Sequence, residues 1–534
     1  MEGKPAAWWD SPEGRRHGEE LGLSESERVA LSFGVVYQVY PRSFQDSNGD
    51  GIGDLEGVRH RLGYLADLGI DTIWLSPFYP SPMADFGYDV SDYCDVDPMF
   101  GTLADFDRLL ADVHDRGMKL IIDWVPNHTS IQHPWFVESR SSCDNSKRDW
   151  YVWADAKRDG SPPNNWQSHF GGGAWEWDEP TGQYYLHSFL TAQADLNWRN
   201  PEVEQAMLDT LRFWLDRGVD GFRMDVVTFI MKDPDLEDDP EPPTNEPPRC
   251  RDHPDVHGVF RRIRQVLDGY QPPRFSIGEI YESDWQRWAS YYGEQLDELN
   301  MPFNFSLLMA SWHPRVVRRL VDACEEAVPA GGWPNYVLSN HDRIRLATRC
   351  GPTEVRLAGM LLLTLRGMPT LYYGDELGME QVDIPPERQQ DPWGRQMPGM
   401  GRDGCRTPME WNGGPHAGFS TVSPWLPVAE GWQTRNVGLQ GADSPLAFYR
   451  RMLAVRRRTP ALEVGSYRSI DGPDGCFVFE RSDGAERYVV ALNFGGTDRR
   501  IDVSGTVVLS TRLDVEGPVD HLDVRPHEGL LVRR

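Results

Sequence analysis

Carboxylate side chains stand at the ends of several apolar segments of this sequence. Residues 218–227 read as a buried strand whose last apolar positions are interrupted by Arg223 and Asp225. A charged pair at the end of a buried strand is unfavourable unless the charges are paired or used for chemistry. Glu279 and Asp342 stand in comparable positions after two later apolar segments. These residues are therefore the first candidates for a catalytic site.

Paired carboxylates are the groups that cleave glycosidic bonds. One attacks the sugar carbon, and the other, kept protonated, delivers a proton to the leaving oxygen. Asp225 suits the nucleophile because the guanidinium of Arg223 stabilises its anion. Glu279, between apolar neighbours, suits the acid, and Asp342 would hold sugar hydroxyls and tune Glu279. A single Asp at a strand end is more often a structural ion pair, but three converging carboxylates are hard to explain by packing.

Helical periodicity alternates with short apolar strands along most of the chain. Segments with helical spacing at 58–68, 103–116, 256–267, 316–327 and 354–365 precede strands near 72–77, 119–125, 275–280, 336–342 and 370–375. This alternation predicts an α/β fold with a parallel sheet covered by helices. A closed (β/α)8 TIM barrel is favoured over an open doubly wound sheet, because no Gly-rich phosphate fingerprint follows the first strand at 35–40. In a barrel, the polar residues at the strand ends share one face.

Two interruptions of the alternation predict further domains. Residues 129–197 are rich in Trp, Ser, Asp and Gly and too long for a loop, so they predict an inserted domain after the third strand. Residues 459–534 contain short alternating runs separated by Asp-Gly and Gly-Gly turns, which predict an antiparallel β domain. The barrel would then comprise residues 34–128 and 198–458, preceded by a polar N-terminal extension at residues 1–33.

Two polar segments lie outside the alternation. The N-terminal extension is polar and charged and is expected to be partly helical, from Ser24 to Leu31. Between Lys232 and Pro254 lies an acidic segment with several prolines. Prolines and like charges resist packing, so this segment is predicted to be an exposed loop near the active-site face.

The composition limits the partners and the compartment. The chain has 54 Lys and Arg against 82 Asp and Glu, a net charge of −28, which argues against a nucleic acid or an anionic membrane as partner. No apolar run approaches a membrane span, and no signal peptide is visible. The seven Cys show no paired short spacing. Neither a zinc site nor a disulfide framework is therefore expected, and a reducing cytoplasm fits best.

A polar loop at residues 46–54 has the composition of a cation site. Asp46, Asn48, Asp50 and Asp54 present alternating side-chain oxygens, and glycines bend the chain between them. This pattern resembles a Ca²⁺ loop, although the distal bidentate Glu of an EF-hand is missing. The alternative is a loop built of Asx turns without a metal. Structural use of a cation is favoured, because no phosphate or redox partner is apparent.

The motifs at the strand ends resemble those of the alpha-amylase superfamily, close to its oligo-1,6-glucosidase and alpha-glucosidase branch. The resemblance is carried by Asp123-Trp-Val-Pro-Asn-His128, Gly221-Phe-Arg-Met-Asp225, Gly278-Glu-Ile280 and Ser339-Asn-His-Asp342, together with residues 37–46, 193–197 and 406–409. It implies a barrel, an inserted domain after the third strand and a C-terminal β-sandwich. It also implies alpha-retaining hydrolysis, with Asp225 as the nucleophile, Glu279 as the acid/base and Asp342 as the transition-state stabiliser.

The same resemblance carries over the residues of a glucose pocket. Asp85 and Tyr88 correspond to residues that bind and stack on the terminal glucose. His128 and His341 correspond to histidines that hydrogen-bond its hydroxyls, and Phe170 corresponds to an aromatic residue of the pocket wall.

Two further groups of residues follow from the resemblance. Arg402 corresponds to the arginine that pairs with the pocket Asp, with Arg406 as the alternative for that role. The loop that begins at Asp46 corresponds to a structural Ca²⁺ or Mg²⁺ site, with the carbonyl of Ile52 as a further ligand.

A closed pocket implies exo action on small oligosaccharides, which releases glucose from the non-reducing end, with transglucosylation as a side reaction. The preferred linkage stays open, because Val226 after the nucleophile occurs in relatives that cleave alpha-1,6 bonds and in others that cleave alpha-1,4 bonds. One alternative is a glucosyltransferase or isomerase on the same scaffold, of the trehalose synthase or sucrose isomerase type. Another is a non-catalytic carbohydrate-binding or scaffold protein, whose relatives carry a membrane span and lose catalytic carboxylates.

Overall fold

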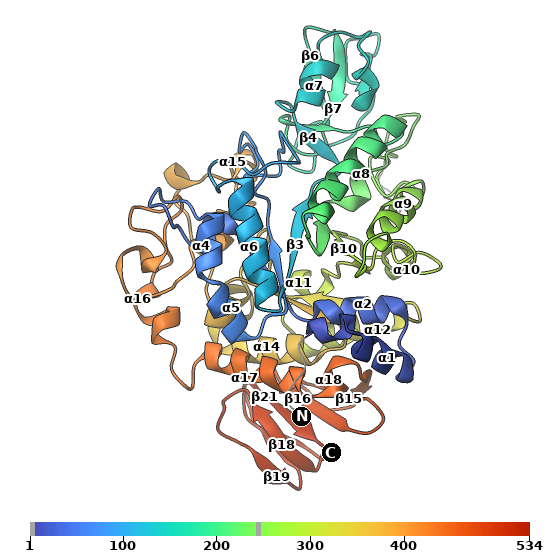
Figure 1. Cartoon of the computed structure of the whole chain (residues 1–534). Coiled ribbons are helices and arrows are strands. Elements are labelled where there is room, and N and C mark those ends of the chain that lie inside the picture. Colours follow the sequence, from blue (N-terminus) through green and yellow to red (C-terminus); the bar gives the residue numbers. More distant parts are fainter. Residues whose placement is uncertain (1–5, 242–246) are drawn as a thin grey trace.

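The computed structural model describes residues 6–241 and 247–534 of the chain. A (β/α)8 barrel occupies the centre, an inserted domain lies over one end of it, and an antiparallel β domain lies beyond the other (Figure 1). The predicted fold class, a TIM barrel with an insertion after the third strand and a C-terminal antiparallel domain, is confirmed.

Eight buried parallel strands form the barrel. They are β1 (Val36–Val39), β2 (Thr72–Leu75), β3 (Lys119–Trp124), β9 (Gly221–Met224), β10 (Phe275–Gly278), β11 (Met301–Pro302), β12 (Asn335–Val337) and β13 (Met368–Tyr372). Their order is β11-β10-β9-β3-β2-β1-β13-β12. The side chain of Asn335 spans the seam between β11 and β12, because its Nδ2 donates to the Pro302 carbonyl at 2.8 Å. The carboxyl ends of all eight strands therefore meet at one face.

A helix follows each strand and covers the outside of the barrel. These helices are α5 (Leu62–Leu68), α6 (Leu103–Asp115), α8 (Pro201–Asp216), α9 (Val256–Asp268), α10 (Trp285–Ser290), α12 (Pro314–Ala327), α14 (Val355–Thr364) and α17 (Pro445–Arg457). In α8 the Asn200 side chain caps the first turn by accepting from the backbone N–H of Glu202. The same helix buries Val203, Met207 and Leu211, which recur at helical spacing and face the barrel.

Two details of the barrel differ from the prediction. The helix predicted at residues 58–68 is divided into α4 (Leu55–His60) and α5, because Arg61 leaves the helical region at φ −100° and ψ 3°. The sixth strand, β11, was not predicted. It contains two residues, too few to show the alternation that marks a strand in sequence.

The N-terminal extension is more ordered than predicted. It forms η1 (Ala6–Asp10), α1 (Pro12–Glu20) and α2 (Glu25–Phe33). Ser24 and Glu27 form a capping box at the start of α2, with bonds of 3.0 and 2.7 Å between each side chain and the other residue's backbone N–H. Phe33 stacks on Phe275 of β10 with ring centroids 4.5 Å apart, and Trp9 joins the same buried cluster. The extension thus closes the end of the barrel opposite the carboxylates.

The inserted domain returns to the barrel mouth at both of its ends. It contains β4 (His128–Ser130), α7 (Pro134–Ser139), β5 (Trp153–Ala154), β6 (Trp175–Asp178), β7 (Gln183–Leu186) and β8 (Gln193–Asp195). β4 and β8 pair antiparallel, with His128 opposite Asp195. The first and last strands of the insertion therefore both border the active-site face.

The described part of the acidic segment that follows Lys232 is a largely exposed loop near the active-site face, as predicted, but it is also held by polar contacts. Residues 242–246 of this segment lie outside the described residues. Before them, the carbonyl of Leu236 accepts a bond of 3.0 Å from the Asn164 side chain of the inserted domain. Lys232 itself is buried and forms an ion pair of 2.9 Å with Asp195. Polar contacts with the insertion hold this part of the segment at the barrel mouth.

The C-terminal domain contains two antiparallel sheets. The larger has the order β14 (Ser466–Ile470), β15 (Cys476–Ser482), β16 (Arg487–Asn493), β21 (Glu528–Arg533), β18 (Gly505–Ser510) and β19 (Gly517–Val519), and the smaller pairs β17 (Arg499–Ile501) with β20 (Leu522–Val524). Residues of both sheets, such as Val489 and Ile501, share one buried cluster.

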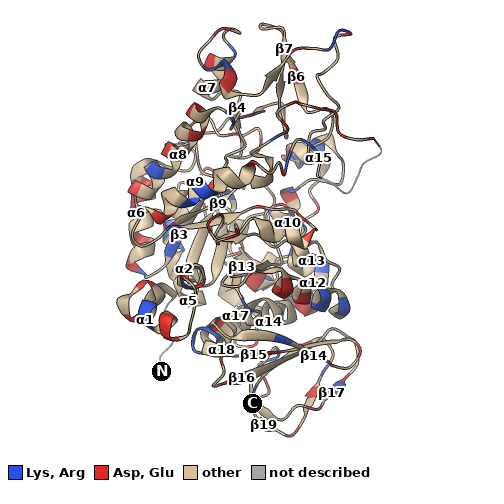
Figure 2. Cartoon of the chain, turned by 90° about the vertical axis from the view of Figure 1, so that its right-hand side faces the viewer, with Lys and Arg blue, Asp and Glu red and all other residues tan. Residues whose placement is uncertain are grey.

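Acidic side chains outnumber basic ones on outer helices such as α6 and α8 (Figure 2). Among the helices of the described chain, none is long and apolar enough to cross a membrane.

Candidate active site

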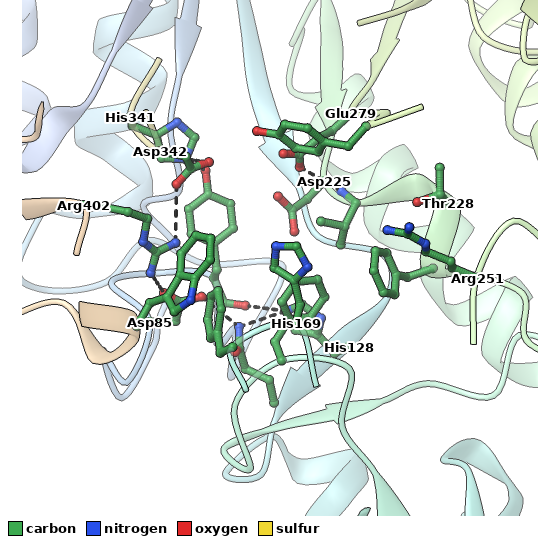
Figure 3. Close-up of a pocket in the computed structure, with 18 of the residues that line it drawn as sticks. Asp85, His128, His169, Asp225, Thr228, Arg251, Glu279, His341, Asp342 and Arg402 are labelled. Atoms are coloured by element: carbon green, nitrogen blue, oxygen red, sulfur yellow. Dashed lines mark hydrogen bonds and ion pairs between the residues drawn. The ribbon is translucent and has the colours of Figure 1, made fainter. Parts of the chain in front are cut away.

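The polar residues predicted at the strand ends surround one pocket at the carboxyl face of the barrel (Figure 3). Asp225, Glu279 and Asp342 follow β9, β10 and β12 and line this pocket. The other predicted residues that line it are Asp85, Tyr88, His128, Phe170, His341 and Arg402. Arg223 lies behind them and is 1% exposed. The structure therefore brings together all residues predicted for the sugar site.

Arg223 is shared among three carboxylates. Its Nη1 lies 2.6 Å from Asp225 Oδ1 and 2.6 Å from Asp123 Oδ1, and its Nη2 lies 2.6 Å from Glu279 Oε2. The sequence predicted this arginine only as the partner of Asp225. A planar guanidinium can bridge several carboxylates, so one buried cation offsets the repulsion among the acids.

Asp225 lies close enough to Glu279 for their charges to interact. Burial raises the pKa of Asp225 well above its usual value; the charge of Arg223 opposes this shift, and the charge of Glu279 adds to it. Inverting glycosidases keep their carboxyl groups about 6.5–9.5 Å apart to hold a water molecule. Retaining enzymes keep them only about 5–5.5 Å apart. Two carboxyl groups bound to one guanidinium, as Asp225 and Glu279 are, fit the retaining arrangement.

The backbone is strained directly after Asp225. Val226 has φ +35° and ψ +46°, a left-handed conformation that a β-branched residue rarely adopts. Its backbone N–H donates to Glu279 Oε2 at 3.0 Å. Strain of this kind persists only where surrounding contacts impose it. The turn thus fixes the position of Glu279 relative to the end of β9.

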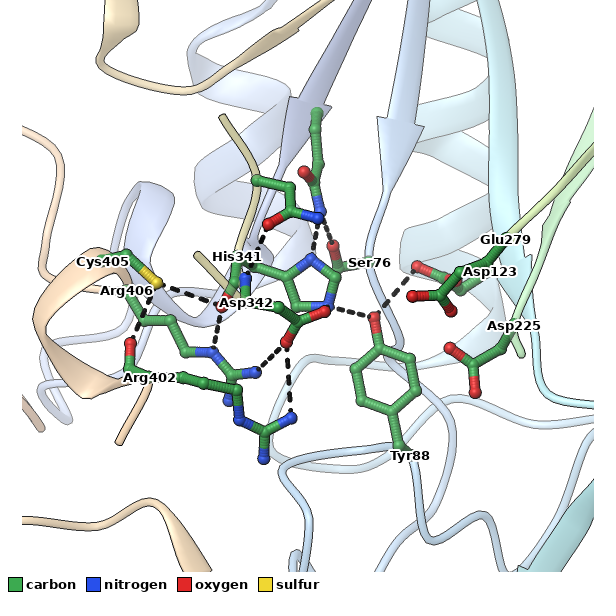
Figure 4. Close-up of polar contacts among 12 residues, drawn as sticks. Ser76, Tyr88, Asp123, Asp225, Glu279, His341, Asp342, Arg402, Cys405 and Arg406 are labelled. Carbon is green, nitrogen blue, oxygen red and sulfur yellow. Dashed lines mark hydrogen bonds and ion pairs between the residues drawn. The ribbon is translucent and has the colours of Figure 1, made fainter. Parts of the chain in front are cut away.

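Asp342 is held by two guanidinium groups (Figure 4). Arg406 Nη2 lies 2.9 Å from Asp342 Oδ1, and Arg402 Nη1 lies 3.4 Å from the same oxygen. Burial alone would raise the pKa of Asp342, but His341, Arg402 and Arg406 hold that pKa well below its usual range. Asp342 is therefore a permanent anion, unlike Asp225, whose pKa is raised.

A second ion pair closes one end of the pocket. Arg402 Nη2 lies 2.6 Å from Asp85 Oδ1 and 2.7 Å from Asp391 Oδ1. Burial raises the pKa of Asp85 to about 6, against the opposing charge of Arg402. Arg402 is therefore the arginine that pairs with the pocket Asp. Arg406, the predicted alternative, donates instead to the His341 carbonyl and to Asp342.

His128 is positioned by the inserted domain. Gln193 Nε2 donates to Asp85 Oδ2 at 3.2 Å and lies 3.0 Å from His128 Nε2. Burial lowers the pKa of His128 to about 4. The imidazole is therefore neutral at physiological pH and can offer hydrogen bonds without adding charge.

His341 and Tyr88 form a flat wall beside the carboxylates. Their rings stack with centroids 5.5 Å apart and an angle of 7°. Gln38 Nε2 donates to His341 Nδ1 at 2.8 Å, so the proton of the neutral ring lies on Nε2, 2.6 Å from the Tyr88 hydroxyl. Burial lowers the pKa of His341 well below its usual value.

Several lining residues were not predicted. Phe170 stacks on one of them, Trp393, at 5.1 Å between ring centroids. The others are His169, Phe189, Gln193, Thr228, Phe229, Arg251, Tyr281 and Arg343. Most of them belong to the insertion or to loops, where no strand end marks a position. Gln193 is the exception, because it belongs to residues 193–197, one of the segments that carry the family resemblance.

The loop proposed as a cation site is built of Asx turns. Asp46 Oδ1 accepts from the Gly49 N–H at 2.7 Å, and Asp50 Oδ1 accepts from the Ile52 N–H at 2.8 Å. Within residues 6–241 and 247–534, no group of three or more His, Cys, Asp and Glu is placed to hold a metal ion. A cation in this loop would therefore need Asn48 or backbone carbonyls as well.

Comparisons with known proteins agree with this geometry. The family model described as the alpha-amylase catalytic domain matches residues 38–465. A probable alpha-glucosidase of Rhizobium meliloti (strain 1021) is 45% identical over 88% of this chain and 90% of its own length. The chain therefore belongs to the alpha-amylase family. It is a glycoside hydrolase, as the residues at the strand ends predicted.

Two further relatives narrow the class. An oligo-1,6-glucosidase of Bacillus cereus is 37% identical over 93% of this chain and 98% of its own length. The crystal structure of XgtA, described as an alpha-glucosyl transfer enzyme, superposes with a TM-score of 0.88 at 41% identity, covering 94% of this chain and 98% of that one. The predicted resemblance to the oligo-1,6-glucosidase and alpha-glucosidase branch is confirmed.

Proposed function

We propose that this alpha-glucosidase is a retaining, exo-acting enzyme that releases glucose from the non-reducing end of short oligosaccharides. The observation that carries the proposal is the placement of Asp225 and Glu279 on one guanidinium, each 2.6 Å from Arg223. Two carboxylates held by one guanidinium are close enough to flank a single anomeric carbon, as a retaining mechanism requires.

The first step is attack by Asp225 on the anomeric carbon. The bond between that carbon and the leaving oxygen breaks, and Glu279 transfers its proton to the oxygen. Water then enters, Glu279 takes its proton, and the resulting hydroxide displaces Asp225 from the sugar. Asp342, ionised at all working pH values, binds sugar hydroxyls and stabilises the positive charge that develops on the ring.

Exo action follows from the closed end of the pocket. The contacts of Arg402 with Asp85 and Asp391, at 2.6 and 2.7 Å, stand beyond the position of the terminal glucose. A charged carboxylate at this wall accepts hydrogen bonds from the outermost sugar hydroxyls. A longer chain would have to break this buried ion pair, so only one sugar unit fits on that side.

The proposal is tested by the products from maltose, isomaltose, sucrose and trehalose. NMR shows which anomer of glucose is released first. Initial release of alpha-glucose supports a retaining hydrolase, and the substrate that is cleaved identifies the linkage. Isomeric disaccharides without free glucose would favour an isomerase, and initial beta-glucose would exclude the retaining mechanism.

Transglucosylation shares the first step, because a sugar hydroxyl can replace water at the glucosyl-enzyme. The similarity to an alpha-glucosyl transfer enzyme supports it as a side reaction. The curated relatives bear hydrolase names, so hydrolysis is favoured as the main reaction. A purely binding protein is not favoured, since all three carboxylates and their cationic partners are present in one pocket.

We also propose a structural Ca²⁺ or Mg²⁺ at the loop of Asp46, Asn48, Asp50, Ile52 and Asp54. All the side-chain donors are oxygens, which suits these cations. The Asx turns use one oxygen of Asp50 for the backbone, while the other contacts only the Asn48 amide at 3.1 Å. A rise in melting temperature with added CaCl₂, abolished by Asp50→Ala, would support the site. A melting temperature unaffected by CaCl₂, MgCl₂ and EDTA would exclude it.

A cytoplasmic location is a further proposal. All seven cysteines are free thiols in the structure, and Cys250, Cys324 and Cys405 are buried. Free thiols persist in a reducing compartment. Fractionation of cells that express the protein tests this, and recovery in the extracellular or periplasmic fraction would contradict it.

A further inference from the structure

The pocket has two halves that differ in charge balance. On the glucose side, each guanidinium has a close carboxylate partner, as in the contact of Arg402 with Asp85 at 2.6 Å. On the opposite side of Asp225 lie Arg251 and Thr228 (Figure 3). Arg343 and Tyr281, which follow Asp342 and Glu279 closely in the chain, line the same pocket. This second half is where the aglycone, the part of the substrate that leaves, must sit.

The two arginines of the aglycone side lack a close carboxylate. Across the described residues, the nearest carboxylate oxygen to Arg251 is Asp252 Oδ2 at 3.8 Å, and no ion pair is formed by Arg343. That aspartate is already engaged, since it accepts a bond of 2.6 Å from the Tyr291 hydroxyl. The Nε atoms of both arginines are buried and have no hydrogen-bond partner.

Their other contacts are with aromatic rings. The Arg343 guanidinium lies 5.2 Å from the centre of the Tyr281 ring, and that of Arg251 lies 5.7 Å from the Phe229 ring. Both cations are close enough to His169 to lower its pKa, after burial, to about 4. The neutral imidazole therefore does not compete with an anion for them.

Among the described residues, other acids around this half have partners of their own: Asp239, for example, accepts a bond of 2.7 Å from the Arg249 N–H. Glu282 pairs with Arg287 at 2.8 Å, and Asp342 is held by Arg402 and Arg406. Other buried arginines without an ion pair in the described chain, such as Arg456 and Arg481, donate to backbone carbonyls at 2.8 and 2.6 Å instead. Guanidinium groups bind carboxylate and phosphate oxygens through paired hydrogen bonds.

We propose that the aglycone half of the pocket binds an anionic group, a carboxylate or a phosphate, carried by the leaving part of the substrate. The inference rests on the proposed hydrolysis and adds the class of aglycone. The bond between the anomeric carbon and oxygen breaks as before, the proton of Glu279 goes to that oxygen, and the aglycone leaves as an alcohol with its anionic group unchanged. Water supplies the hydroxyl of the released glucose.

The space beyond the arginines can hold such a group. A second cavity shares Arg251 and Tyr281 with the catalytic pocket and continues past Trp285, Phe305 and Met309. An aglycone that extends from the catalytic pocket into this cavity passes the Arg251 guanidinium before it reaches these three apolar side chains. An anionic substituent on the first aglycone unit would therefore meet Arg251.

Matched substrates test the inference on the intact enzyme. Maltobionate and maltitol differ only by a carboxylate in place of a hydroxymethyl group, and maltose 6-phosphate differs from maltose by a phosphate. We expect kcat/KM for one or both anionic substrates to exceed that of the neutral partner about tenfold, the size of one charge-assisted hydrogen bond. The excess should shrink as NaCl is added. The substrate pair in which the anionic member has the higher kcat/KM shows whether the bound group is a carboxylate or a phosphate.

Variants assign the effect to the two arginines. Arg251→Gln and Arg343→Gln should each bring the ratio of anionic to neutral kcat/KM toward one, whereas Arg315→Gln, on the exposed outer face beside Asp474, should leave it unchanged. Thermal unfolding shows that each variant is folded. Equal kcat/KM within both wild-type pairs, or a ratio that neither pocket variant changes, would overturn the inference. No glucose from these substrates or from isomaltose would overturn the proposed function instead.

Discussion

Asp225 and Glu279 are bound to opposite arms of one guanidinium, each 2.6 Å from Arg223. They come from neighbouring barrel strands, β9 and β10, which pair in parallel with Arg223 opposite Ile277. This register brings a nucleophile and an acid to one anomeric carbon, where they can act from its two faces. Asp342 lies apart, with cationic partners of its own.

Arg223→Lys tests the shared guanidinium. An ammonium group cannot bridge Asp225, Glu279 and Asp123 at once, so we expect kcat to fall by about a hundredfold or more. Steady-state kinetics and thermal unfolding measure the two consequences, loss of positioning and loss of stability. Arg59→Lys, at a surface pair with Glu56, is the matched control. A Lys variant with near-normal kcat would contradict this role.

Asp225→Ala should lower kcat by roughly four orders of magnitude, since only binding and the remaining groups then assist the reaction. Azide can enter the space left by the carboxylate and attack the anomeric carbon from the same face, giving a beta-glucosyl azide. Glu279→Ala, with a substrate whose leaving group needs no proton, should instead give the alpha azide through the intact nucleophile. NMR of the two products assigns the roles, and the opposite pair of anomers would exchange them.

The pH profile should report Asp85. Burial raises its pKa to about 6, so the carboxylate that pairs with Arg402 is ionised above this pH and protonated below it. We expect kcat/KM to fall, mainly through KM, as the pH drops below about 6. His128 cannot cause this change, because burial lowers its pKa to about 4. A KM that stays constant between about pH 7 and pH 5 would speak against this assignment, as would the same fall in Asp85→Asn.

The sequence was sufficient to predict the acids and the barrel. Asp225 and Glu279 interrupt short apolar strands, and charges in such positions are visible without coordinates. The alternation of helices and strands then predicts that their ends converge. The partners of these acids were harder to predict. That Arg223 also contacts Glu279 depends on the pairing of β9 with β10, which is a tertiary relationship.

Residues on loops carried the weakest signal. Asp391 binds Arg402 from a segment without periodicity, and Arg251 follows a Pro-rich stretch that composition predicted to be exposed. The order of the N-terminal extension, and its packing against the barrel, were underestimated for a related reason. Its apolar residues, such as Trp9 and Phe33, are few in sequence, but they gain their importance by packing against the end of the barrel.

Phe33→Ala tests that packing. The side chain is 1% exposed and stacks on Phe275 at the end of the barrel opposite the pocket. We expect the free energy of unfolding to fall by about 3–5 kcal/mol, the cost of truncating a buried Phe, while kcat changes little. Denaturant unfolding and initial rates measure both quantities, and Phe213→Ala, on the partly exposed face of α8, is the control. Unchanged stability would mean that the extension does not support the barrel.

Trapping the covalent intermediate tests the central claim most directly. With 5-fluoro-alpha-glucosyl fluoride, the bond between the anomeric carbon and fluorine breaks, fluoride leaves and the nucleophile forms a glucosyl ester that hydrolyses slowly. Mass spectrometry of peptic peptides should find one fluoroglucosyl group on Asp225, and Asp225→Ala should remain unlabelled. A label on Glu279 or Asp342, or turnover without any covalent adduct, would contradict the retaining mechanism proposed here.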